Sequence, residues 1–254
     1  MIQIKHLSAG YGAEPVLHDL SFSIPKGSIT TLVGPNGCGK TTLLRILTGQ
    51  LSPISGSVSV CGKEIRAYSR KELARTVALL PQHRNIPELT VETLVQHGRY
   101  PHLGMTRRLT EKDQEIVSRA MEQTDITSLA HRQLRELSGG QQQRAYIAMA
   151  LAQDTPIIVL DEPTAHLDLN RQFELLELIG QLQKTGKTVV LVLHDLDHAL
   201  RRSDQLVLLR EGRLVRVGTP RQLLDSGDLE QVFQISIKEA EGGYILAKKP
   251  TIEN

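Results

Sequence analysis

Aromatic side chains are scarce in this 254-residue sequence: they make up 3% of it, and tryptophan is absent. Few rings are therefore available for the base stacking on which the binding of single-stranded nucleic acid depends. The charge balance agrees, because 30 lysines and arginines against 28 acidic residues leave a net charge of only +2. A nucleic-acid surface normally carries a strong basic excess, so we expect no nucleic-acid partner.

Cysteine is also rare. Cys38 and Cys61 are the only two in the sequence, which argues against a secreted disulfide scaffold. No run of 18 or more apolar residues occurs, so no segment is predicted to span a bilayer, and the first residues lack the pattern of a signal peptide. We expect a soluble protein of a reducing compartment, whose role at a membrane depends on a partner.

Strand and helix patterns alternate along the sequence. Residues 2–24 alternate in period two and predict short antiparallel strands. Apolar runs at 28–34, 156–163 and 188–195 predict buried strands, and their alternation with helical patterns is typical of a parallel α/β sheet. We predict one domain over residues 1–254, with an α/β core (1–82 and 155–254) that includes an N-terminal antiparallel β subdomain, an inserted α-helical subdomain (83–154) and a frayed tail (249–254).

The stretch LVGPNGCGKTTLLRILTG, residues 32–49, places a glycine-rich loop between a strand pattern and a helix pattern. It contains G-x-x-x-x-G-K-[ST], the phosphate-binding P-loop. The glycines let backbone amides turn toward phosphates, the helix N-terminus and Lys40 add positive charge, and Thr41 offers a hydroxyl to Mg²⁺. A glycine-rich turn of no special purpose is disfavoured by the strand–loop–helix context. The predicted nucleotide contacts here are Gly34, Pro35, Asn36, Gly37, Cys38, Gly39, Lys40, Thr41 and Thr42.

Two carboxylates follow the predicted buried strand IIVL, in the stretch IIVLDEP. In an α/β sheet, ligands bind at the carboxyl ends of the strands. We predict that Asp161 reaches the shell of a Mg²⁺ ion and that Glu162 polarises a water for attack on a γ-phosphate. An acidic turn after a strand is common, so this pair alone decides little.

The stretch LSGGQQQR, residues 137–144, has two interpretations. Ser138 and Gln141 have the spacing of a capping box, which predicts a helix start and nothing more. However, Gly139 and Gly140 in a first helical turn cost about 1 kcal/mol each relative to alanine, and they suit the close approach of an anion. Because the sequence has a single P-loop, we predict that this second phosphate contact serves a nucleotide held by another copy of the protein.

These motifs occur together with Gln82, HLD (166–168) and His194 in the order and approximate spacing of the ABC-type ATPases, and the sequence resembles that family over nearly its whole length. The resemblance implies a RecA-like P-loop NTPase fold, with ATP and Mg²⁺ as cofactors. It also implies that ATP is hydrolysed in a homodimeric sandwich, between the P-loop of one copy and the LSGGQ helix of the other. Alanine at position 165 departs from the serine that the family often has before the interface loop.

The resemblance assigns roles to single residues. Tyr11 would stack on adenine, although an ordinary hairpin tyrosine is the alternative. Gln82 would touch Mg²⁺ and sense a membrane partner. His194 would contact the γ-phosphate and orient the attacking water. Ser138 and Gly140, flanked by Gly139 and Gln141, would contact the nucleotide of the opposite protomer, and Asp168 would cross the dimer interface.

GRYPHLG, residues 98–104, is similar to the GRxPH stretch of ATPases that serve ferric-siderophore, haem and cobalamin importers. The alternative is a helix end, with Gly98 as the cap and Pro101 as the stop. The importer resemblance implies polytopic permease subunits as partners, an indirect link to a substrate-binding protein, and a peripheral place on the cytoplasmic face of the inner membrane. We rank ferric siderophore first as cargo and haem or cobalamin next. A soluble single-cassette ABC ATPase of cofactor assembly is the rival interpretation.

Overall fold

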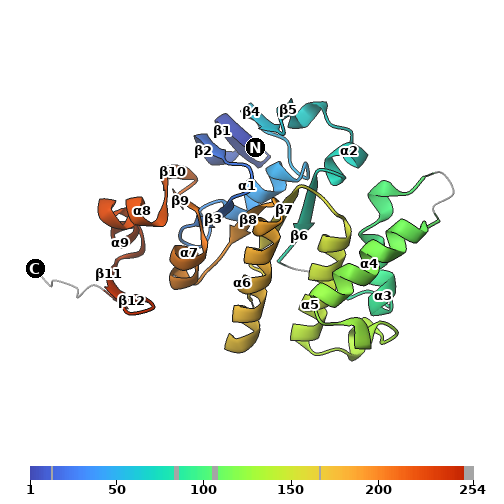
Figure 1. The fold of residues 1–254 in the computed structure, drawn as a ribbon. Helices are drawn as coiled ribbons and strands as arrows, with labels where there is room; N and C mark the ends of the chain where they lie inside the picture. The colour runs from blue at the N-terminus through green and yellow to red at the C-terminus, as the bar shows by residue number, and fades with distance from the viewer. Residues whose placement is uncertain (13, 83–85, 105–107, 166, 249–254) are drawn as a thin grey trace, which may run out of the picture. The chain divides into compact units, whose positions relative to one another are not determined.

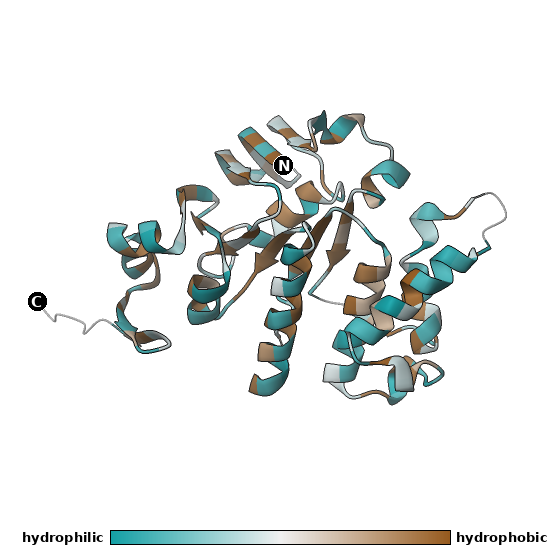
Figure 2. Ribbon diagram, in the orientation of Figure 1, coloured by the Kyte–Doolittle hydropathy of each residue, from teal (hydrophilic) through white to brown (hydrophobic). Residues whose placement is uncertain are grey.

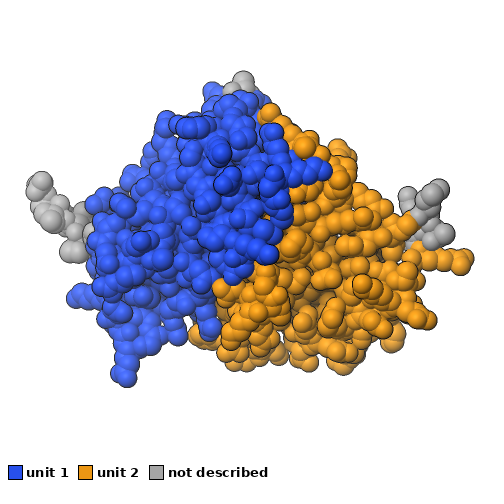
Figure 3. Space-filling view, turned by 45° about the horizontal axis from the view of Figure 1, so that its top comes forward, with its two compact units in different colours: residues 1–65, 190–254 blue, residues 66–189 orange. Residues whose placement is uncertain are grey.

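A computed structural model of the chain (Figure 1) describes residues 1–12, 14–82, 86–104, 108–165 and 167–248. It divides into two compact units, which Figure 3 shows in different colours: residues 1–65 with 190–254, and residues 66–189. We describe each unit by itself. The predicted subdomain bounds stay a prediction; the residue at which the predicted insertion starts, His83, and the predicted frayed tail, 249–254, lie outside the described residues.

The first unit begins with the predicted antiparallel sheet. Its strand order is β2-β1-β4-β5, with Ile2 opposite Ile24 and also opposite Val60. Side chains alternate between buried and exposed over residues 2–5, as the period-two pattern predicts, and the alternation is interrupted further on, where the register of β1 against β2 shifts. The strands are β1 (Ile2–Tyr11), β2 (Glu14–Ile24), β4 (Ser55–Val60) and β5 (Lys63–Glu64). Helix α1 (Lys40–Leu47), which contacts β1 and β2, buries the leucines of its helical pattern.

The same unit holds a parallel pair, β3 (Ile29–Val33) and β9 (Gln205–Arg210). All five residues of β3 are buried, which explains its unbroken apolar and β-branched sequence. β9 continues into β10 (Arg213–Gly218) through a hairpin at Glu211 and Gly212, and both of these residues have positive φ. In Figure 2 the brown, hydrophobic colour is strongest along buried strands, whereas brown and teal alternate along the helices.

The chain then adds elements that we did not predict. They are α7 (Leu196–Arg202), α8 (Pro220–Ser226), α9 (Asp228–Phe233), β11 (Ile235–Ala240) and β12 (Gly243–Lys248). β11 and β12 form a two-stranded antiparallel hairpin. The backbone N–H of Tyr244 donates to the Asp197 carboxylate at 2.8 Å, which ties this hairpin to α7.

The second unit contains the parallel pair β6 (Val77–Leu80) and β7 (Ile157–Asp161), with Leu80 opposite Leu160. Its helices are α2 (Arg70–Ala74), α3 (Val91–His97), α4 (Glu111–Gln123), α5 (Gly139–Ala152) and α6 (Leu169–Lys184). Short 3₁₀ turns cover Ile65–Ala67, Tyr100–His102, Thr127–Leu129 and Leu134–Glu136, and β8 (Thr188–Val192) contains the boundary between the units. α5 packs against both α3 and α4. Within the described ranges, we find no helix with the length and hydropathy that a bilayer crossing requires.

Candidate nucleotide site

The P-loop in the first unit has a backbone that only glycine adopts readily. Gly34, Gly37 and Gly39 have φ values of 150°, 77° and 100°. At Gly34 a Cβ atom would lie 2.1 Å from the carbonyl oxygen of Leu209, and at Gly39 it would lie 2.3 Å from a methyl group of Leu17. Conformation and packing therefore both require glycine at positions 34 and 39, and conformation requires it at 37.

The N-terminus of α1 leaves its backbone amides open to a ligand. Gly39 is its N-cap residue, so no side chain caps the helix, and no acidic residue lies in the first turn. No side chain therefore caps the first-turn N–H groups or offsets the partial positive charge of the helix start, which is the condition for anion binding.

Lys40 is folded over the loop that precedes it. Its Nζ donates to the carbonyl oxygens of Gly34 at 2.7 Å and Pro35 at 3.0 Å, and the residue is only 7% exposed. Cys38 is buried beside it, and burial raises the pKa of the Cys38 thiol even though Lys40 acts in the other direction. Thr41 is half-buried and Thr42 is buried, both in the first turn of α1.

Tyr11 is held against the P-loop helix. It is 52% exposed, and its hydroxyl accepts a hydrogen bond of 2.9 Å from Nη1 of Arg45 in the last turn of α1. The Arg45 guanidinium also lies 5.5 Å from the centre of the tyrosine ring. These two contacts hold the exposed ring beside α1, the helix that follows the P-loop.

The second unit brings Gln82 to Glu162. Gln82 lies two residues after β6, and Glu162 directly follows β7, so the parallel pairing of these strands places both residues at the same edge. The Gln82 amide Nε2 donates to Oε2 of Glu162. Glu162 has a φ of 52°, a conformation that non-glycine residues adopt rarely and often at functional sites. Asp161, the last residue of β7, is 4% exposed.

The predicted capping box at the start of α5 is confirmed. The Ser138 hydroxyl accepts from the Gln141 backbone N–H, and the Gln141 side chain accepts from the Ser138 N–H. A Cβ atom at Gly139 would meet nothing within 4 Å, and at Gly140 it would make only an ordinary contact of 3.6 Å with Leu167. Among the described residues, packing therefore gives no reason for this pair of glycines.

The two remaining predicted residues lie at helix starts. Asp168 is the N-cap of α6, and its carboxylate accepts from the backbone N–H of Arg171 at 3.0 Å. His194 is exposed and follows β8, one residue before Asp195, the N-cap of α7. His166, the first residue of HLD, lies outside the described residues.

The GRYPH segment holds the C-terminal end of α5, which the sequence did not reveal. Arg99 is buried; its Nε lies 2.9 Å from the Asp113 carboxylate, and its Nη1 donates to the Ala152 carbonyl at 2.8 Å. His102 Nε2 lies 2.8 Å from the Gln153 carbonyl. Gly98 does end α3, but its φ of −57° does not require glycine. What requires glycine is the neighbouring helix α5, whose backbone would lie 2.2 Å from a Cβ atom here.

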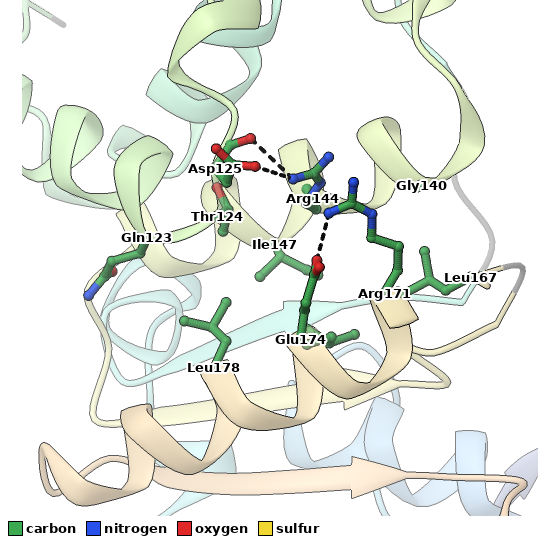
Figure 4. Close-up of a pocket in the computed structure, with 11 residues that line it drawn as sticks. Gln123, Thr124, Asp125, Gly140, Arg144, Ile147, Leu167, Arg171, Glu174 and Leu178 are labelled. Atoms are coloured by element: carbon green, nitrogen blue, oxygen red, sulfur yellow. Dashed lines mark hydrogen bonds and ion pairs between the residues drawn. The ribbon is translucent and has the colours of Figure 1, made fainter. Parts of the chain in front are cut away.

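A cavity of about 260 Å³ lies beside Gly140, between α5 and α6 (Figure 4). Two ion pairs flank it. Arg144 donates to both the backbone carbonyl and the carboxylate of Asp125, and Arg171 lies 2.7 Å from Glu174. Because each guanidinium already has a carboxylate partner, the cavity has no excess charge of either sign.

The predicted metal donors carry oxygen atoms but form no independent metal site. Within the described part of the chain, no group of three or more His, Cys, Asp or Glu side chains could hold a metal ion. Thr41, Gln82 and Asp161 offer a hydroxyl, an amide oxygen and a carboxylate. Mg²⁺ prefers oxygen ligands and is commonly bound by one or two carboxylates together with substrate phosphates. Each of these three donor types therefore suits a Mg²⁺ ion that arrives with a nucleotide.

Comparison with known proteins agrees with this architecture. The ABC transporter family profile matches residues 17–165. The chain is 44% identical to the iron(3+)-hydroxamate import ATP-binding protein FhuC of Bacillus subtilis, over 92% of this chain and 88% of that one. It is 45% identical to the ferric enterobactin transport ATP-binding protein FepC of Escherichia coli, over 90% of this chain and 85% of that one.

Solved structures show the same fold. The dimeric structure of MJ0796, a bacterial ABC transporter cassette, superposes with a TM-score of 0.78 at 28% identity, covering 87% of this chain and 99% of that one. The predicted fold class, a P-loop NTPase with an antiparallel β subdomain and added helices, is thereby confirmed. This chain belongs to the ABC transporter family as an ATP-binding subunit, an ATPase coupled to transport.

Proposed function

We propose that two copies of this chain form a sandwich around two ATP molecules and drive the import of a ferric siderophore through membrane permease subunits. The observation that carries the ATP chemistry is the start of α1, where an uncapped helix N-terminus, glycines with positive φ and Lys40 converge on one loop. Each of these features favours a polyphosphate and none of them favours a neutral ligand.

In this proposal the P-loop residues 34–42 bind the phosphates and Tyr11 stacks on the adenine. Lys40 exchanges its two carbonyl partners for phosphate oxygens. Thr41, Gln82 and Asp161 would hold Mg²⁺, which neutralises charge on the β- and γ-phosphates when it is bound.

Glu162 acts as the general base for the attacking water, and His194 contacts the γ-phosphate. The backbone strain at Glu162 supports its assignment, because such strain persists where the surroundings fix a residue for function. A positioned base contributes about 10²–10⁴-fold to the rate.

The glycine pair at the start of α5, which packing does not explain, supports the proposed homodimer. Gly139 and Gly140 stand at a helix start, with open space where a side chain of residue 139 would be and only an ordinary contact where one of residue 140 would be. A phosphate of the opposite nucleotide can approach these amides directly, with Ser138 and Gln141 beside it. Asp168 crosses the interface. The dimeric MJ0796 cassette supports this arrangement.

The cargo and the partners rest on the relatives. FhuC, FepC and the petrobactin import protein FpuD of Bacillus anthracis, which is 43% identical over 92% of this chain, are named for ferric siderophores. We propose the same cargo class here, with polytopic permease subunits as direct partners, a substrate-binding protein as an indirect one, and a peripheral position on the cytoplasmic face of the inner membrane.

Two measurements test the proposal. Glu162→Gln should bind ATP normally but hydrolyse it at least 100-fold more slowly, whereas Lys40→Ala should lose both binding and turnover. A fully active Glu162→Gln protein would overturn the assignment of the base. For the cargo, cells that lack this chain should lose uptake of ⁵⁵Fe bound to a hydroxamate or catecholate siderophore, and the wild-type chain, but not Glu162→Gln, should restore it. Unchanged iron uptake would overturn the cargo assignment and leave the ATPase intact.

A further inference from the structure

We propose that Gln143 is a positioning residue that links the N-terminus of α5 to the loop of Glu162, so that each ATP site responds to the other. This inference rests on the proposed sandwich. Its physical basis is a buried hydrogen bond: Nε2 of Gln143 donates to the backbone carbonyl of Pro163 at 2.5 Å, and Gln143 is only 7% exposed.

The position of that bond makes it important for the backbone of Glu162. Pro163 directly follows Glu162, whose left-handed backbone is stable only if neighbouring groups hold it. The turn itself contributes a bond from the Ala165 N–H to the Glu162 carbonyl at 3.2 Å, and Gln82 holds the carboxylate. Gln143 holds the following peptide from outside the loop, so a shift of Gln143 moves the backbone that carries the proposed base.

The other end of the link is the glycine pair. Ser138, Gly139 and Gly140 begin the same helix that carries Gln143, about one turn away. A helix with its capping box formed moves as a rigid element, and the Gln142 amide fixes the segment before it through the carbonyls of Leu134 and Leu137, at 3.1 Å each. Contact of these glycines with the nucleotide of the second copy is therefore transmitted within one protomer to its own Glu162.

A merely structural role makes a different prediction. A buried amide that only satisfies a carbonyl would, on removal, lower stability and leave the cooperativity between two sites untouched. Cooperativity of ATP hydrolysis in the full-length protein is therefore the decisive measurement, since a two-site sandwich gives a Hill coefficient up to 2.

The test variant is Gln143→Met, which keeps the length and shape of the side chain and removes its donor. We expect kcat to fall about tenfold, the effect of one hydrogen bond, and the Hill coefficient to fall from near 2 toward 1. Binding of a fluorescent ATP analogue at dilutions that keep the protein monomeric should be unchanged. The matched control is Gln114→Met on the exposed face of α4, which should keep the wild-type kcat and Hill coefficient.

A second variant, Gln143→Glu, distinguishes positioning from damage to the fold. Only the protonated carboxyl can donate to the Pro163 carbonyl, and burial raises the pKa of a carboxyl group. The kcat of this variant relative to wild type should rise as the pH falls from 8 to 6, while that of Gln143→Met should stay flat. A Gln143→Met protein with wild-type kcat and Hill coefficient would overturn the link and leave the sandwich standing. A wild-type protein with no turnover, or with a Hill coefficient of 1, would overturn the sandwich itself.

Discussion

The side-chain amide of Gln82 donates a hydrogen bond to the carboxylate of Glu162, so the residues that follow two adjacent parallel strands are in direct contact. In the proposed reaction this contact orients the base toward its water. Gln82→Met should therefore lower kcat by about 10- to 100-fold, because a hydrogen bond to a charged group contributes about 1.5–3 kcal/mol. ATP affinity, measured by equilibrium titration without Mg²⁺ so that the proposed metal contact of Gln82 does not contribute, should change less than threefold. A loss of affinity without a loss of kcat would show that Gln82 serves nucleotide binding and leaves the base unaffected.

The glycine pair at the start of α5 should lower the stability of the fold, because these positions are kept as glycine for function. Gly139→Ala should raise the free energy of unfolding by about 0.4–1 kcal/mol, because the site is open and the substitution restricts the unfolded chain. ATP turnover should nevertheless fall, since the added methyl group blocks the approach of the second nucleotide. Gly180 in α6 also faces open space, so Gly180→Ala should give the same gain in urea unfolding with unchanged turnover. Equal activity of the two variants would count against the sandwich.

Two substitutions of Tyr11 distinguish the stacking of its ring from the hydrogen bond of its hydroxyl group. Tyr11→Phe removes the hydroxyl that Arg45 contacts but keeps the ring, and should bind ATP within about threefold of wild type. Tyr11→Ala should weaken ATP binding by about 1–3 kcal/mol, the usual contribution of one stacked base. If Tyr11→Ala binds ATP like the wild type, then Tyr11 is an ordinary hairpin residue.

Asp113 gives stability a defined dependence on pH. Burial favours a higher pKa, but hydrogen bonds from Thr110 and Arg99 outweigh it and lower the pKa of Asp113 from 3.8 to about 2. A carboxyl whose pKa is lowered on folding stabilises the protein above its ordinary pKa, and this contribution disappears as the pH falls toward 2. Asp113→Asn should therefore lose about 2 kcal/mol in urea unfolding at pH 7.

The loss should be constant between pH 7 and 5 and should shrink below pH 4. Glu115→Gln, on the exposed face of the same helix, should change the free energy of unfolding by less than about 0.5 kcal/mol both at pH 7 and below pH 4. A deficit of Asp113→Asn that does not depend on pH would show that the carboxylate charge is not what stabilises this contact.

Local motifs were predictable from the sequence because their partners are a few residues apart. The capping box of Ser138 and Gln141 forms where its spacing in the sequence predicts it. The strand–loop–helix order around Lys40 is local in the same sense. Each of these signals comes from intrinsic backbone and capping preferences.

The contacts that define the site were not predictable in this way. Arg99 reaches the Ala152 carbonyl across 53 residues, and Gln143 reaches Pro163 across 20. The sequence did offer one signal for the second contact. Gln143 lies one helical turn before the apolar Ile147, and a polar residue on an apolar helix face needs a hydrogen-bond partner inside the protein. Only the tertiary structure shows which carbonyl that partner is. The C-terminal hairpin was missed although ISIKEA and GYILAK flank a glutamate and a glycine.

That hairpin has a practical consequence for handling the protein. Tyr244 donates its backbone N–H to Asp197, and Gly243 leaves the room that this carboxylate occupies, since a Cβ atom there would lie 2.8 Å from it. Asp197 belongs to α7, whose N-cap, Asp195, directly follows His194. A shortened expression clone that stops before Gly243 would thus loosen the helix next to the proposed γ-phosphate contact, and fusions for purification or fluorescence should keep residues up to Lys248 intact.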